Sequence, residues 1–156
     1  MWIPGEGTLN PGTGFLRPVS STTLTNPATA IRAITVGAYD SLTFSYADFS
    51  GRGPLTGESA SAVKPDLVAP GVNVSTISVG GSVMQFSGTS FSTPFVTGSA
   101  ALLMEWGIVR GNDSYLYGEK VKAYLRRGAK PMPGFEEYPN EAVGYGRLCL
   151  AESIPD

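Results

Sequence analysis

The sequence predicts a domain of the α/β kind, in which short buried strands combine with helices. Two β-branched runs, residues 33–38 and 67–69, end near glycine or proline, as buried strands often do. Farther along, residues 90–106 and 117–127 show the spacing of helices. The chain has 156 residues, of which 42% are hydrophobic, so it is long enough for one domain with a sizeable core.

The strand pattern continues into a predicted hairpin. Residues 72–77 alternate in polarity and extend the second strand region. Gly80 and Gly81 then separate residues 76–79 from residues 82–86, a pattern that favours a hairpin across a glycine turn. Two strands would thus deliver the chain to the start of the long helix.

The two predicted helices differ in the distribution of their apolar residues. In residues 90–106 apolar side chains occur on every side, so this helix is expected to be buried in the centre of the domain. Residues 117–127 instead predict an amphipathic helix at the surface. Its apolar face consists of Val121, Tyr124 and Leu125. Residues 143–150 predict a last short strand.

The chain is predicted to consist of an N-terminal arm followed by part of a domain. Residues 1–27 are rich in glycine, proline, serine and threonine and have little apolar periodicity, so they are expected to form an extended arm or insertion. Residues 28–156 carry the patterned elements. Because a compact domain rarely begins with so long a loose segment, the arm is expected to pack against protein outside this chain.

Composition excludes several function classes. The net charge is −2 and no basic cluster is longer than the pair Arg126 and Arg127, so no nucleic-acid partner is expected. The longest strongly apolar stretch, residues 100–104, is far shorter than a membrane span requires. One cysteine, Cys149, permits no internal disulfide and is expected to fill the core. The chain has no histidine, so the usual general base is missing.

Ser90 is the candidate nucleophile, because it stands where a glycine-containing turn enters a helix. The N–H groups and partial positive charge of a helix N-terminus can stabilise the oxyanion that forms when a serine attacks a carbonyl. Gly88, Thr89 and Ser90 itself would support that oxyanion. The alternative is that Ser90 only caps the helix. Ser92 stands where the α/β-hydrolase elbow requires glycine, so that class is disfavoured.

The serine segment and its surroundings resemble the subtilases, the subtilisin-like serine proteases of the peptidase S8 type. Five blocks carry this resemblance in the order that the family has them. They are residues 27–30 with 34–38, 49–54, 64–72, 88–103 and 144–148. Residues 106–150 are further similar to clostridial subtilases linked to spore germination and to relatives from gut bacteria.

This resemblance implies a three-layer α/β fold with a mostly parallel sheet, of which this chain would be the C-terminal portion. It also implies peptide-bond hydrolysis through an acyl-enzyme on Ser90. In the family the catalytic Asp and His precede the first block found here, and so does the asparagine that donates to the oxyanion. Alone, the chain is therefore expected to be inactive, and neither Asp40 nor Asp48 is assigned to the triad.

Three further residues have more than one interpretation. Phe91 would face the leaving-group side of the cleft in this family, or it packs in the core. Asp66 contributes to a structural calcium site, as nearby loops do in some subtilases, or it is a solvated carboxylate in a turn. Phe95 replaces a histidine of many relatives, but that histidine is not the catalytic base. No metal ligand set and no other cofactor is assigned.

The expected partners are a peptide or protein substrate and the upstream part of the same catalytic domain. A homodimer or swapped assembly is also expected, because a sheet cut at its N-terminal side exposes an edge. The resemblance suggests a secreted or spore-associated bacterial protein. Two alternative functions remain: a catalytically dead subtilase fold that binds or scaffolds, and a sedolisin-type peptidase that uses Ser, Glu and Asp.

Overall fold

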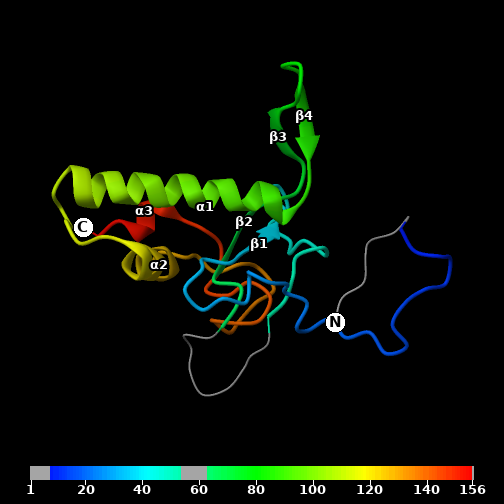
Figure 1. Ribbon diagram of the computed structural model, residues 1–156. Helices are drawn as coiled ribbons and strands as arrows, with labels where there is room; N and C mark the ends of the chain where they lie inside the picture. The colour runs from blue at the N-terminus through cyan, green and yellow to red at the C-terminus, as the bar shows by residue number, and fades with distance from the viewer. Residues whose placement is uncertain (1–7, 54–62, 156) are drawn as a thin grey trace.

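The protein contains helices and strands in a mixed arrangement, seen in a computed structural model that describes residues 8–53 and 63–155 (Figure 1). The elements are β1 (Val36–Tyr39), β2 (Leu67–Pro70), β3 (Val74–Ile77), β4 (Val83–Phe86), α1 (Thr89–Met104), a π-helical turn (Glu105–Val109), α2 (Gly118–Arg127) and α3 (Leu150–Ser153). Residues 8–35 contain no helix or strand. The division between arm and domain stays a prediction. The described residues do not include Pro54, the last residue of the block at residues 49–54.

A parallel pair of strands forms the centre. β1 pairs with β2 in parallel, with Val36 opposite Leu67 and Tyr39 opposite Pro70. Residues 146–148 add to the free edge of β2, where the Val68 N–H donates to the Gly146 carbonyl at 2.9 Å. The expected strand at residues 143–150 is reduced to isolated bridges, of Arg147 with Val68 and Lys130 and of Gly144 with Asn140.

Two glycines explain why that last strand fails to form. Gly144 and Gly146 adopt φ values of +56° and +118°, in the region that favours glycine and that a strand does not use. A Cβ on either would collide with backbone, on Gly144 with the Pro65 carbonyl and on Gly146 with that of Lys130. The chain therefore passes through tight turns, and Leu150 starts α3.

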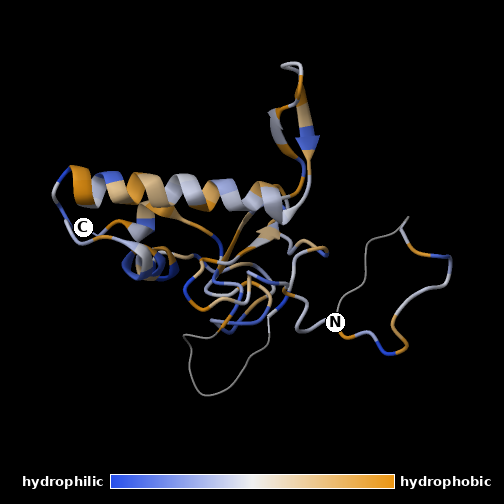
Figure 2. Cartoon of the chain, in the orientation of Figure 1, coloured by the Kyte–Doolittle hydropathy of each residue, from blue (hydrophilic) through white to orange (hydrophobic). Residues whose placement is uncertain are grey.

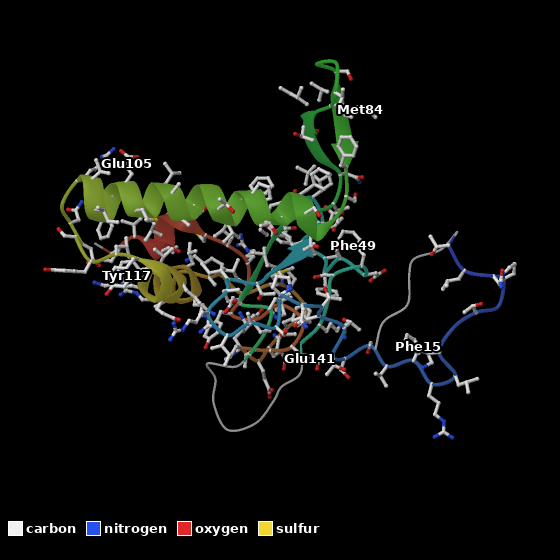
Figure 3. All side chains as sticks on the ribbon, in the orientation of Figure 1. Phe15, Phe49, Met84, Glu105, Tyr117 and Glu141 are labelled. Atoms are coloured by element: carbon white, nitrogen blue, oxygen red, sulfur yellow. The ribbon has the colours of Figure 1, made fainter. Side chains whose placement is uncertain are left out.

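The predicted hairpin is confirmed. β3 and β4 are antiparallel, with Ile77 opposite Val83, and both turn glycines have positive φ. The hairpin projects from the rest of the molecule, and Met84 is seen on it (Figure 3). Four of its apolar side chains are exposed, those of Ile77, Val79, Val83 and Met84. That the chain forms a homodimer or swapped assembly stays a prediction.

Helix α1 packs against β1, β2 and α2 through one face only. The main core cluster consists of Leu67, Ala69, Val96, Leu103, Leu116, Val121 and Leu125. The expectation that α1 is buried on every side is wrong, since Phe95 and Leu102 are 43% and 52% exposed. The described residues supply one layer against this helix and none against its other face. Hydrophobic residues nevertheless occur along its whole length, whereas α2 is largely hydrophilic (Figure 2).

The smaller expectations have mixed outcomes. α2 is amphipathic as predicted, with Val121 and Leu125 buried. Cys149 is half-buried beside the start of α3 and is not part of the core. Within the described ranges no helix is long and apolar enough to cross a membrane.

Candidate active site

Ser90 is exposed at the start of α1, and hydrogen bonds tie the turn before it to the central strands. The Gly88 N–H donates to the Gly71 carbonyl at 2.8 Å, and the Gly71 N–H donates to the Tyr39 carbonyl at 3.0 Å. Gly88 has φ of +152°, which favours glycine. The ends of β1 and β2 thus fix the position from which Ser90 emerges.

The close approach of Gly71 to α1 is a feature that the sequence did not reveal. A Cβ at this position would collide with the Ser92 hydroxyl and lie 2.7 Å from the Ala38 Cβ. Ser92 is fully buried, and its hydroxyl has no hydrogen-bond partner in the described part of the chain. In the sequence Pro70-Gly71 marked only the end of a strand, whereas in the structure Gly71 is also a packing contact.

Replacement of Gly71 by alanine is expected to lower the free energy of unfolding by about 1 to 3 kcal/mol, because the added methyl overpacks this contact. Urea unfolding measures the change. Gly98→Ala is the matched control, since nothing lies within 4 Å of its added Cβ, and it should stabilise α1 by about 0.5 to 1 kcal/mol. Equal stability of the Gly71 variant and the unaltered chain would contradict this account.

The helix start offers two backbone donors. The Phe91 N–H donates to the Gly88 carbonyl at 3.0 Å, whereas the N–H groups of Thr89 and Ser90 meet no protein acceptor among the residues described. The residue that caps α1 is Gly88, and no side chain caps it, so the interpretation of Ser90 as a mere cap is wrong. The arrangement leaves donors and a partial positive charge beside an exposed hydroxyl.

A hollow of about 280 Å³ lies next to Ser90. Residues 27–28 and 33–36 line one side of it, and Thr89, Ser90 and Thr93 line the other. The hollow is therefore built between the segment that leads into β1 and the first turns of α1.

Phe91 is half-buried, belongs to neither core cluster and has two surroundings. Its ring stacks on Phe86 with centroids 5.3 Å apart and an interplanar angle of 12°. It also lines a second hollow, of about 320 Å³, with residues 74–76, Pro94 and Phe95. A role of Phe91 on the leaving-group side stays a prediction.

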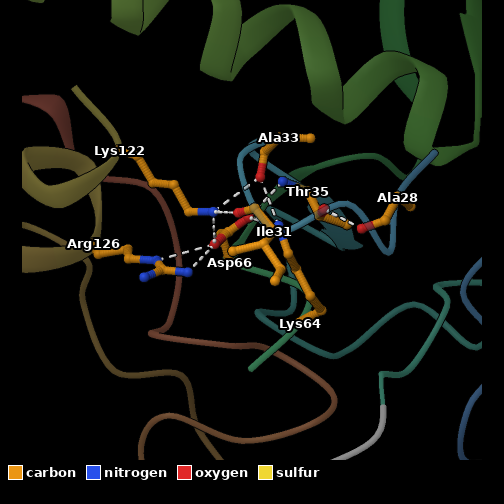
Figure 4. Close-up of polar contacts among 8 residues, drawn as sticks. All are labelled: Ala28, Ile31, Ala33, Thr35, Lys64, Asp66, Lys122 and Arg126. Carbon is orange, nitrogen blue, oxygen red and sulfur yellow. Dashed lines mark hydrogen bonds and ion pairs between the residues drawn. The ribbon is translucent and has the colours of Figure 1, made fainter. Parts of the chain in front are cut away.

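Asp66 is fully buried, which shows that the solvated-carboxylate interpretation is wrong (Figure 4). Its Oδ2 accepts from the Thr35 N–H at 2.6 Å and from Lys64 Nζ at 2.8 Å. Its Oδ1 accepts from the Arg126 guanidinium and lies 3.2 Å from Lys122 Nζ. We call these four residues, Lys64, Asp66, Lys122 and Arg126, the Asp66 cluster.

The Asp66 cluster does not fit a calcium ion. Both carboxylate oxygens are engaged, and three cationic side chains would repel a further cation. The described ranges also contain no group of three or more His, Cys, Asp or Glu side chains that could hold a metal. No step below depends on a metal.

The surroundings within the cluster shift the pKa values of Asp66 and Lys122. Burial raises the pKa of Asp66, but hydrogen bonds from Lys64 and Thr35 and the charges of Lys122 and Lys64 outweigh burial, so this pKa lies below its usual value. Burial lowers the pKa of Lys122, although Asp66 acts in the opposite direction. Direct contacts therefore favour the charged form of Asp66, whereas burial acts against the charged form of Lys122.

The fold is shared with proteases of known structure. A model of the subtilase family matches residues 12–146, so the chain belongs to the subtilases, as the five sequence blocks predicted.

Particular relatives extend this assignment. The structure of the CspB protease of Clostridium perfringens is 45% identical, with a TM-score of 0.85, and the match covers 93% of this chain and 30% of that one. The prenylagaramide maturation protease PagA is 30% identical with a TM-score of 0.70, over 86% and 46% of the two chains. Serine protease AprX of Bacillus subtilis is 30% identical over 155 residues. The predicted similarity to clostridial subtilases is confirmed.

The chain spans about a third of the length of AprX and of CspB, at 32% and 30%. It matches each of them over most of its own length, at 86% and 93%. The observed mixture of helices with parallel strands therefore corresponds to part of the fold of these longer relatives. The chain contains no histidine to act as base for Ser90.

Proposed function

We propose that this chain supplies the nucleophile of a serine endopeptidase. The observation that carries the proposal is the position of Ser90, exposed at the N-terminus of α1 beside two N–H groups that have no protein acceptor in the described ranges. Membership in the subtilase family supports it. The hollow of about 280 Å³ beside Ser90 would receive a side chain of the peptide substrate.

In the proposed reaction the Ser90 Oγ attacks the carbonyl carbon of the scissile peptide bond, and its proton passes to a general base. The negative charge that develops on the carbonyl oxygen is stabilised by the N–H of Ser90 and by the Gly88–Thr89 turn. The C–N bond then breaks, and the protonated base gives its proton to the leaving amine. Water hydrolyses the acyl-enzyme in the same manner.

In this proposal the general base is a histidine, which this sequence lacks, so the base comes from outside the chain. We propose that an Asp and a His in an upstream part of the same catalytic domain, or in a partner chain, complete the site. Alone, the chain is inactive, because a serine hydroxyl without a base is a weak nucleophile.

The missing histidine also favours two other functions. A subtilase fold without a base would serve as a scaffold or binding module, and a sedolisin-type enzyme would use Glu in place of His. If the protein is a scaffold, Ser90 should be unreactive both in this chain and in the full-length protein. If it is a sedolisin-type enzyme, it should hydrolyse peptides at acid pH, and a Glu and an Asp should lie upstream.

Labelling with a fluorophosphonate tests the proposal. In the natural full-length protein the probe is expected to modify Ser90, located by mass spectrometry, whereas this chain alone stays unlabelled because it lacks the base. Ser92→Ala is the control that should keep the label, since this buried serine lies two residues away in the same helix. No label in the full-length protein would refute the proposal and support the scaffold.

A further inference from the structure

The segment of residues 31–35 precedes β1 and is held by charged side chains from distant parts of the chain (Figure 4). Lys122 Nζ donates to the carbonyls of Ile31 at 2.6 Å and Ala33 at 3.0 Å. Lys64 Nζ donates to the same Ala33 carbonyl at 2.6 Å. All three contacts are made by lysines of the Asp66 cluster to backbone oxygens.

Asp66 holds the same segment from the other direction. The Thr35 N–H donates to its carboxylate at 2.6 Å, and the Asp66 N–H donates to the Thr35 carbonyl at 2.8 Å. The Thr35 hydroxyl in turn donates to the Ala28 carbonyl at 2.6 Å, so residues 28 and 35 are linked. These contacts order a backbone stretch that is in neither a helix nor a strand.

Residues 33–35, together with Pro27, Ala28 and Val36, form the wall of the hollow that faces Thr89 and Ser90. The Asp66 cluster contacts the segment through its backbone and contributes no side chain to the hollow itself. The cluster therefore lies behind the wall and does not touch a group bound in the hollow.

The charge balance of the cluster indicates that it positions a backbone segment and does not only stabilise the fold. One carboxylate faces three cations, and the side chains of Lys64 and Lys122 are only 5% and 4% exposed. Well-packed apolar residues often give equal or greater stability than buried ions. The two lysines also donate hydrogen bonds to the carbonyls of Ile31 and Ala33, which partly compensate the surplus positive charge. These carbonyls are therefore fixed at defined places.

We propose that Lys64, Asp66 and Lys122 are positioning residues that fix residues 31–35 as the wall of the hollow and thereby set the affinity for the substrate group that enters it. This inference rests on the proposed function. It assigns the cluster an effect on KM and little effect on the chemistry at Ser90, because the cluster does not contact the nucleophile.

Lys122→Met in the full-length protein tests the inference, because methionine fills similar space without the ammonium group. KM is expected to rise about tenfold with kcat within about twofold, the loss expected from removing hydrogen bonds to a charged group. Lys120→Met is the matched control, since Lys120 lies on the same helix, is exposed and pairs only with Asp113 in the described residues. It should leave both constants unchanged. Lys122→Arg, which keeps the charge, should recover part of the affinity.

Amide hydrogen exchange provides a second readout that needs no catalysis. Exchange of residues 31–35 is expected to accelerate about tenfold in Lys122→Met and to stay unchanged in Lys120→Met. If Lys122→Met does not fold, Lys64→Met removes the other donor to the Ala33 carbonyl and serves in its place.

Unchanged exchange at residues 31–35, or a fall in kcat at constant KM, would overturn the inference. The proposed function fails on a different result, the absence of a fluorophosphonate label on Ser90. Faster amide exchange at residues 31–35 without a label on Ser90 would therefore refute the endopeptidase proposal. It would still support the role of the cluster in holding this wall.

Discussion

Replacement of Ser90 by alanine is expected to lower kcat of the full-length protein by about 10⁶-fold, the magnitude found when a subtilisin loses its nucleophile. The reason is that no acyl-enzyme can form without the Ser90 Oγ, so only the oxyanion donors and substrate binding still contribute. Hydrolysis of a peptide library, quantified by mass spectrometry, measures the change.

The structure supplies a control for this variant. Ser92 is on the same helix, but its hydroxyl is buried against Gly71 and has no partner in the part of the chain described. Ser92→Ala is therefore expected to leave kcat within about twofold, because it removes no group that contacts substrate. An equal fall for both variants would indicate a general structural effect, and an active Ser90→Ala variant would refute the assignment of the nucleophile.

Asp66→Asn is expected to destabilise the fold by about 3 to 5 kcal/mol, because it leaves three cations without their buried counter-charge. This loss is a large fraction of the stability of a typical domain. Chemical denaturation measures it. Asp113→Asn is the matched control, since Asp113 is also a carboxylate that accepts hydrogen bonds but is only partly buried and pairs with one exposed lysine, so its effect should be smaller.

The same carboxylate predicts a pH dependence. The pKa of Asp66 is lower in the folded chain than its ordinary value, so its contribution to stability is present above the unfolded pKa of about 4. That contribution is lost as the pH falls through the folded pKa. Stability of the unaltered chain is thus expected to decline below about pH 4, with a shallower decline in Asp66→Asn. Identical acid profiles would contradict the role of Asp66.

Adding Lys122→Met to Asp66→Asn is expected to recover part of the lost stability, because one of the unpaired cations is removed. The four denaturation measurements form a double-mutant cycle. Strict additivity would show that Asp66 and Lys122 do not act together.

Local patterns in the sequence were sufficient for several elements. The glycine pair and its flanking alternation predicted the hairpin, and the spacing of Val121 and Leu125 predicted the amphipathic helix. The ordered blocks predicted the family and located Ser90 at a helix start. Each of these elements, and each block taken singly, depends on residues within a few positions of one another, so a local pattern contains the information.

What only the tertiary structure decided depends on contacts between distant residues. The sequence indicated neither the burial of Asp66 nor its pairing with Arg126, which is 60 residues away. The apolar residues on every side of α1 predicted full burial, yet the described chain places a layer on one face alone. The sequence by itself thus determined the family, the nucleophile candidate and the local elements. The burial of charges and the wall beside Ser90 follow from long-range packing, which a periodic pattern does not encode.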